Sequence, residues 1–173
     1  MQRARIRKVV LWFVSAAIAT LMLISYSGAQ SKLADEINER GAPLFDNLGS
    51  YQHAISTKSP EAQRYFNQGL ILTYGFNHGE AIRSFKEAVR LDANCAMCYW
   101  GVALALGPNI NKPMDAADVP RAWKALQQAN RLAAIATEKE KAYINALAAR
   151  YSSQPVADRR SLEAGAAQPG VLA

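Results

Sequence analysis

The chain has 173 residues, half of them hydrophobic, with 20 lysines and arginines, 14 acidic residues and two cysteines. That length suits one domain with a modest core, this composition excludes wholesale disorder, and two cysteines exclude a disulfide-built scaffold. Residues 1–29 hold four of the basic residues and no acid, so residues 30–173 carry 16 basic and 14 acidic residues. A net charge of +2 over that stretch leaves no footprint for RNA or DNA, and no nucleic-acid partner is expected.

The beginning of the chain has the pattern of an export signal. A basic stretch, Met1–Lys8, precedes the sixteen-residue apolar run Val9–Ile24. Sixteen residues are short for a membrane span of about 20 and suit the apolar region of a signal peptide. The small residues Ser27–Ala29 then stand where a signal peptidase would cut. Two interpretations stay open: a cleaved signal peptide over residues 1–29, or an uncleaved anchor that contacts the membrane through residues 9–24.

Both interpretations place the rest of the chain outside the cytoplasm, in the periplasm or anchored to the inner membrane. Residues 30–58 mix polar residues with Gly and Pro, and we expect a linker there. A helical domain is expected over residues 59–151. Its first helix begins at Ser59–Glu61, where a capping Ser, a Pro and an acid favour a helix start, and Gly75–Gly79 ends it. The second helix is expected from about Glu80 to Leu91.

The later part of the chain continues this alternation of helices and breaks. Gly107–Asp118 is rich in Pro and Asn and is expected to be a loop, with Asp118 as the cap of the next helix. A further helix is expected to start at Thr137, because Glu140 three residues later completes a capping box. Residues 152–173 are small, polar and without apolar periodicity, and we expect a disordered tail there.

An internal repeat relates these helices to one another. The pattern Y-x-x-Q-G-x-x-L at Tyr65 returns 34 residues later as Y-x-x-V-A-x-x-L at Tyr99. The pattern A-x-x-x-F-x-x-A at Ala81 returns 41 residues later as A-x-x-x-L-x-x-A at Ala122. The small residues let neighbouring helices approach, and the large ones fill the space between them. This arrangement resembles the tetratricopeptide repeat (TPR) over about residues 60–151.

Three stretches are similar to the long TPR proteins of the bacterial cell envelope, namely Glu61–Gly69, Phe76–Ala81 and Cys98–Asn111. The resemblance implies an all-α fold in which antiparallel helix pairs stack as a short solenoid. Those relatives have several more repeats, whereas this chain holds two and a half. Because each repeat buries its faces on its neighbours, we expect a truncated and marginally stable member of the family.

The resemblance also implies a binding surface, because one stripe of each first helix in a TPR array faces a concave groove. That stripe comprises Gln63, Phe66, Leu70, Thr73 and Tyr74 in the first repeat, and Met97, Trp100 and Leu104 in the second. Aromatic and Met side chains suit an extended or helical segment of a partner protein. The alternative that stays open is a core role, with these residues covered by neighbouring repeats or by Tyr51–Ile55.

Cys95 and Cys98 form the one motif with chemical potential. A C-x-x-C pair can form a local disulfide; zinc is not expected because no second pair exists, and covalent haem would require His where Tyr99 stands. We expect Asn94 to cap the helix and place Cys95 in its first turn, where the helix dipole favours thiolate. Overlay of the repeats puts both cysteines at polar positions. A functional thiol pair and a structural pair therefore both stay open.

Motifs for enzymatic chemistry are absent from the sequence: there is no Gly-rich phosphate loop, no His-x-x-x-His pair and no Gly-x-Ser-x-Gly elbow. His53 and His78 are interpreted as solvated or capping residues, and no enzyme activity, cofactor or metal is expected. The leading hypothesis is an exported adaptor that binds another protein or a peptide segment through the TPR groove. The alternatives are a thiol–disulfide or metal-handling protein built on Cys95 and Cys98, and a fragment of a longer TPR protein without a function of its own.

Overall fold

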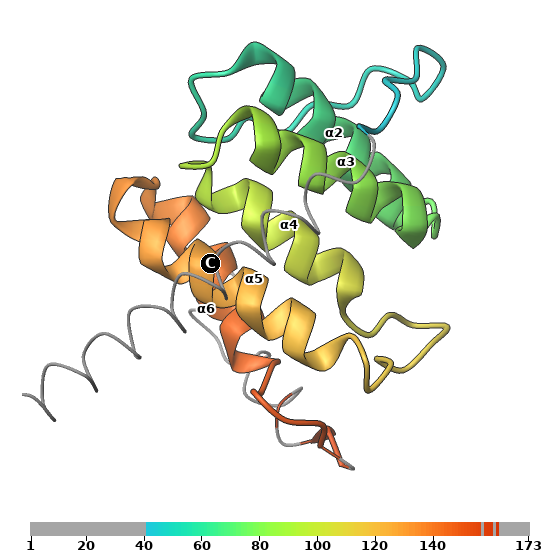
Figure 1. The fold of residues 1–173 in the computed structure, drawn as a ribbon, viewed down its shortest axis with the longest axis vertical. Coiled ribbons are helices and arrows are strands. Elements are labelled where there is room, and N and C mark those ends of the chain that lie inside the picture. The colour runs from blue at the N-terminus through green and yellow to red at the C-terminus, as the bar shows by residue number, and fades with distance from the viewer. Residues whose placement is uncertain (1–40, 157, 161, 163–173) are drawn as a thin grey trace, which may run out of the picture. The chain divides into compact units, whose positions relative to one another are not determined.

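The computed structural model describes residues 41–156, 158–160 and 162. Within them lie α-helices and one short 3-10 helix, and no β-strand: α2 (Pro60–Tyr74), α3 (His78–Leu91), α4 (Ala96–Leu106), α5 (Val119–Leu132), η1 (Ala133–Ile135) and α6 (Glu138–Ala149) (Figure 1). The all-α class is confirmed. Helices pack in pairs, α2 on α3 and α4 on α5, and α3 packs on α4. The expected export segment lies outside the described residues, and no helix within them is long and apolar enough to cross a membrane.

Local capping chemistry sets where these helices begin. The Ser59 hydroxyl accepts a hydrogen bond from the Ala62 N–H at 3.1 Å and starts α2 as predicted. Asn77 caps α3 through its side chain, so this helix begins at His78 rather than at about Glu80. The predicted capping box of α6 is confirmed, with hydrogen bonds in both directions between Thr137 and Glu140. The loop expected after α4 also forms, and Asp118 stands at the N-cap of α5, where its side chain makes no capping bond and pairs with Arg121 instead.

The packing of the two helix pairs centres on Phe85 of α3. This ring is fully buried and lies against Gly69 of α2 and Gly101 of α4. A Cβ at Gly69 would come within 2.7 Å of the ring, and one at Gly101 would overlap it more deeply. Glycine at both positions therefore lets three helices meet around one aromatic side chain. The small residues predicted at helix crossings are buried as well: Ala81, Ala88, Ala103, Ala122 and Ala129.

The part of the expected linker that the structure describes is bound to the helices. Residues 41–58 contain no helix or strand, yet they hydrogen-bond along α2. The Phe45 N–H donates to Gln68 Oε1 at 2.8 Å, and Tyr65 Oη donates to the Ala42 carbonyl at 2.8 Å. Gln68 is buried, and a buried amide needs partners, which this segment provides.

After α6 the chain is held by one aromatic residue. Tyr151 is buried, and its hydroxyl donates to the Ala103 carbonyl at 2.7 Å. Residues 152–156 then form no helix or strand. Most of the expected disordered tail, residues 152–173, lies outside the described residues.

Candidate peptide-binding groove

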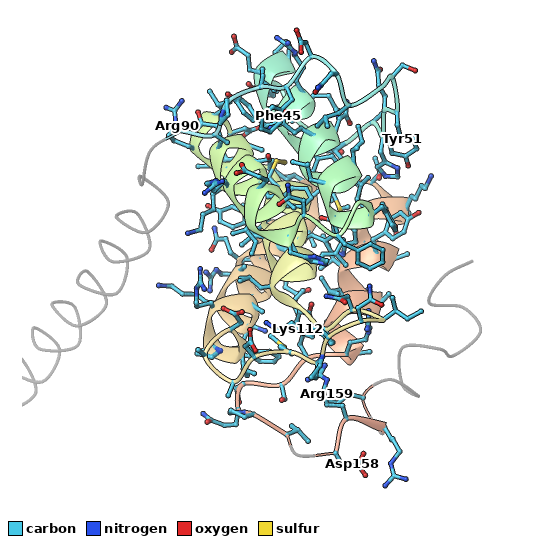
Figure 2. All side chains as sticks on the ribbon, turned by 90° about the vertical axis from the view of Figure 1, so that its right-hand side faces the viewer. Phe45, Tyr51, Arg90, Lys112, Asp158 and Arg159 are labelled. Carbon is cyan, nitrogen blue, oxygen red and sulfur yellow. A yellow bond between two sulfur atoms is a disulfide. The ribbon has the colours of Figure 1, made fainter. Side chains whose placement is uncertain are left out.

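Residues 51–57, called the strap below, contact both α2 and α6. The strap runs antiparallel to α2, since His53 bonds to Asn67, Ile55 bonds to Gln63, and the chain then turns into the helix at Ser59. Figure 1 shows the strap within the cyan to blue-green trace that leads from residue 41 into α2. Figure 2 shows the labelled residues Phe45 and Tyr51 on the same trace, away from Lys112 of the loop after α4.

Two side-chain amides of α2 hold the strap by its backbone. Asn67 Oδ1 accepts from the His53 N–H at 3.1 Å, and Gln63 Oε1 accepts from the Ile55 N–H at 3.0 Å. Gln63 Nε2 donates to the His53 carbonyl at 2.9 Å and to Asn67 Oδ1 at 2.9 Å. We call Gln63 and Asn67 the amide clamp. Gln63 and Asn67 are four residues apart in a helix, which is a rise of about 6 Å. His53 and Ile55 are two residues apart in an extended segment, which is a rise of about 6.6 Å. The spacing of the two amides therefore matches the spacing of the two backbone N–H groups that they bind.

The ring of His53 lies among aromatic side chains from different helices. Its centroid is 6.2 Å from that of Phe66 in α2 and 5.9 Å from that of Tyr143 in α6, the latter in a T-shaped arrangement. Tyr143 in turn lies 5.8 Å from Trp100 in α4, whose Nε1 donates to the Tyr143 carbonyl at 3.0 Å. Phe66 lies 5.5 Å from Phe85. The strap therefore places one ring in a continuous aromatic row, at distances typical of favourable ring pairs.

Glu140 at the start of α6 binds the other end of the strap. Its side chain is buried, and it accepts from both the N–H and the hydroxyl of Ser56, each at 2.6 Å, one on each carboxylate oxygen. The backbone N–H and hydroxyl of Thr137 donate to it as well, at 2.7 and 2.9 Å. Burial by itself would raise the pKa of Glu140, but these hydrogen bonds outweigh it and the pKa lies below its ordinary value. The carboxylate is therefore charged at neutral pH, at the helix end that favours an anion.

The strap ends at a shallow pocket beside the C-terminus of α3. The Thr57 hydroxyl donates to Asp92 Oδ2 at 2.6 Å. The pocket has a volume of about 450 Å³, and its lining comes from the strap end, the turn after α3 and η1: Ser56, Thr57, Lys58, Asp92, Asn94 and Ile135. Ser56 and Thr57 of the strap thus each meet a carboxylate, one on α6 and one after α3.

The structure divides the predicted groove stripe into residues that are accessible and residues that are not. Phe66, Leu70, Met97 and Trp100 are buried. Gln63, Thr73 and Leu104 are partly exposed, and Tyr74 is 74% exposed at the end of α2. The Thr73 hydroxyl bonds back to the Gly69 carbonyl of its own helix. On the first repeat the strap lies against this stripe, as the alternative involving Tyr51–Ile55 anticipated, and on the second repeat α6 covers Trp100.

The cysteine pair differs from the expectation in two respects. Cys95 and Cys98 form a disulfide, and both side chains are completely buried, although the repeat overlay placed them at polar positions. The overlay fails because α4 is an interior helix, in which every residue except Leu104 is buried. Asn94 is not the cap either: Cys95 caps α4, with its Sγ accepting from the Cys98 N–H at 3.1 Å, while Asn94 bonds back to Asp92. An external thiol therefore cannot reach either sulfur atom to attack the disulfide.

Three of the helix residues that contact the strap lie outside the predicted stripe, namely Asn67, Glu140 and Tyr143. Together with the stripe residues of α2 they form what is called the groove below. A signal for Asn67 exists, because it stands four residues after Gln63 and shares its helix face. In the sequence, Glu140 is already explained by its role in the capping box. No sequence pattern therefore indicates that it also binds Ser56, which lies 84 residues away. Tyr143 comes from α6, and no spacing relates it to α2.

The two histidines have different surroundings. His53 belongs to the aromatic row, whereas His78 starts α3 and its Nε2 lies 3.5 Å from Asn109 Nδ2. In the described part of the chain, His, Cys, Asp and Glu side chains form no group of three that could hold a metal ion. Comparison with protein-family models, with curated proteins and with solved structures found no match for this chain. The groove is therefore interpreted from its own geometry.

Proposed function

We propose that this protein is a non-enzymatic adaptor of the TPR type, which holds an extended segment of another protein in the groove between α2 and α6. The observation that carries the proposal is the amide clamp. Gln63 and Asn67 bond to two backbone N–H groups and one carbonyl of an extended segment, at 2.9–3.1 Å. A site that binds an extended backbone in the same chain has the donors and acceptors to bind one from another chain.

The character of the groove supports binding rather than catalysis. Its charged group, Glu140, has all its hydrogen bonds directed at Ser56 and Thr137, and it stays ionised at neutral pH. The aromatic row offers large, rigid surfaces for a partner side chain. A thiol–disulfide function receives no support from this geometry, because Cys95 and Cys98 are both buried.

We place this adaptor outside the cytoplasm, in the periplasm or on the inner membrane. The support comes from the basic and apolar pattern of residues 1–29 and from the Cys95–Cys98 disulfide, a bond that persists in oxidising compartments.

Photo-crosslinking in a bacterial envelope tests the proposal. A photoreactive phenylalanine replaces Tyr143 in the groove, and in a matched chain it replaces Lys139, which is exposed one turn away on α6. Both are also made in a strap variant that combines His53→Ala with Ser56→Ala, so that the strap does not shield the groove. We expect position 143 to cross-link to a discrete envelope protein in the strap variant, and position 139 to give no such product. Cross-linking from neither position, or equally from both, would contradict the proposed adaptor.

A further inference from the structure

We infer that the strap is an internal copy of the ligand, so that the groove selects extended segments with a ring at one position and Ser or Thr three residues later. In the strap these positions are His53 and Ser56. The inference rests on the proposed function and names the partner by its chemistry. Each position of the pattern corresponds to a group on the helices that meets it.

The hydroxyl position is set by Glu140. Ser56 gives this carboxylate two donors, its N–H to Oε1 and its Oγ to Oε2, both at 2.6 Å. Replacing the hydroxyl residue by Ala removes one charge-assisted bond, and replacing it by Pro removes the N–H. Ser56 itself is exposed, but an acidic or phosphorylated residue in its place would set a second negative charge directly against the buried Glu140 carboxylate. The groove is therefore expected to reject phosphoserine where it accepts serine.

The ring position is set by the aromatic side chains on either side. The centroid of His53 lies 6.2 Å from that of Phe66 and 5.9 Å from that of Tyr143, which are distances for direct ring contact. A small side chain at this position would remove one ring contact from Phe66 and one from Tyr143, which would then keep their pairs with Phe85 and Trp100. An aromatic ring at this position of a ligand, such as His, Phe, Tyr or Trp, is expected to make the same two contacts.

The backbone between these positions is recognised without regard to side chains. The amide clamp accepts the N–H groups of His53 and Ile55 and donates to the carbonyl of His53. A ligand therefore needs an N–H at the ring position and two residues later, which excludes Pro from both. Ala54 between them is exposed, and its identity is expected to be free.

The strap also competes with any free ligand. A segment joined to its own binding site acts at an effective concentration of the order of millimolar, which a weakly binding free peptide does not match. The native chain is thus expected to bind such a peptide weakly, and weakening the strap is expected to open the groove.

The test uses a fluorescent peptide with the sequence of residues 50–58 and the full-length chain, with binding followed by fluorescence anisotropy. We expect the strap variant (His53→Ala with Ser56→Ala) to bind this peptide at least about tenfold more tightly than the native chain. We also expect peptides carrying Ser56→Ala, or phosphoserine at 56, to bind at least about tenfold more weakly than the native peptide. A peptide carrying Ala54→Ser is the matched control and should bind like the native peptide.

The outcomes separate the inference from the function on which it rests. If the strap variant binds all four peptides equally, the hydroxyl position of the pattern is wrong while an extended-segment groove stands. If no peptide binds to either chain, both the inference and the proposed groove are wrong. Circular dichroism verifies folding of the strap variant, and the single Ser56→Ala chain replaces it in the same titrations if the double variant does not fold.

Discussion

Equivalent faces of the two helix pairs are covered in different ways. In the second pair, the face of α4 is covered by another helix, and Trp100 is 8% exposed with its indole N–H on the Tyr143 carbonyl. In the first pair, the face of α2 is covered by the strap, whose backbone is held by Gln63 and Asn67. One face is therefore closed mainly by apolar packing, and the other mainly by hydrogen bonds to an extended segment.

This difference indicates which face can exchange its cover. Removing a packed helix exposes apolar surface, which costs about 25 cal/mol per Å². Hydrogen bonds to an extended segment are replaced by water or by another segment at a net cost of about 1 kcal/mol each. The α2 side is accordingly where an exchange of ligands is expected, and the α4 side is where stability is expected to reside.

The largest expected effect is on the α4 side. Trp100→Ala removes a buried ring and its hydrogen bond to Tyr143, and we expect the free energy of unfolding to fall by about 3–5 kcal/mol in urea titrations. The control is Tyr74→Ala on α2, because that ring is 74% exposed and its loss should change stability by about 0.5 kcal/mol or less. A Trp100→Ala chain as stable as the native protein would mean that the α4 face is not part of the core.

The next effect concerns the contact of the strap with the buried carboxylate of Glu140. Glu140→Gln keeps the shape of the side chain but removes its charge, and we expect a loss of about 1.5–3 kcal/mol in urea unfolding. Glu138→Gln, two residues earlier, is the control because its side chain is 90% exposed. Equal stabilities of these two variants would mean that the Ser56 contact contributes nothing beyond an exposed charge.

The same carboxylate predicts a pH dependence. The pKa of Glu140 lies below its ordinary value of 4.5 in the folded chain, because the hydrogen bonds from Ser56 and Thr137 outweigh burial. Its contribution to stability is therefore complete above about pH 5 and is lost as the pH falls through the lowered pKa. We expect the native chain to lose more stability than Glu140→Gln between about pH 5 and about pH 3. Parallel pH curves for the two chains would contradict the assignment.

A further prediction concerns the ring that both helix pairs share. Gly101→Ala would drive a Cβ into the Phe85 ring, and we expect a loss of about 1–3 kcal/mol. Gly69→Ala should cost less, because its Cβ would overlap the ring less deeply. The control is Gly79→Ala at the start of α3, where the added Cβ would meet nothing within 4 Å apart from its own helix backbone and chain neighbours. If the Gly101→Ala chain has the same free energy of unfolding as the Gly79→Ala control, then Phe85 can move aside and the core is looser than the packing indicates.

The smallest effect is expected at the amide clamp. Asn67→Ala removes the acceptor of the His53 N–H and should cost about 0.5–1.5 kcal/mol. Hydrogen exchange at His53 is the sharper measurement, because exchange there should accelerate while the amides of α4 stay protected. Asn145→Ala on the exposed side of α6 serves as the control. Unchanged exchange at His53 would mean that the clamp does not hold the strap.

Much of the secondary structure follows from local chemistry that the sequence carries openly. Ser59, Asn77 and Thr137 cap their helices through side-chain oxygens within three residues of the helix start. The all-α class likewise follows from apolar residues at helical spacing. Such features are predictable because the interacting groups are neighbours along the chain.

The groove depends on contacts between residues far apart in the chain. Ser56 meets Glu140 across 84 residues, and Trp100 meets Tyr143 across 43. The role of Gly101 and the burial of Cys95 and Cys98 also follow from the interior position of α4. Periodicity tells which residues share a face of one helix, but what covers that face is set by how the helices and the strap pack in three dimensions. For this reason the repeat resemblance could indicate the stripe of α2, whereas its cover, the strap, was decided only by the tertiary structure.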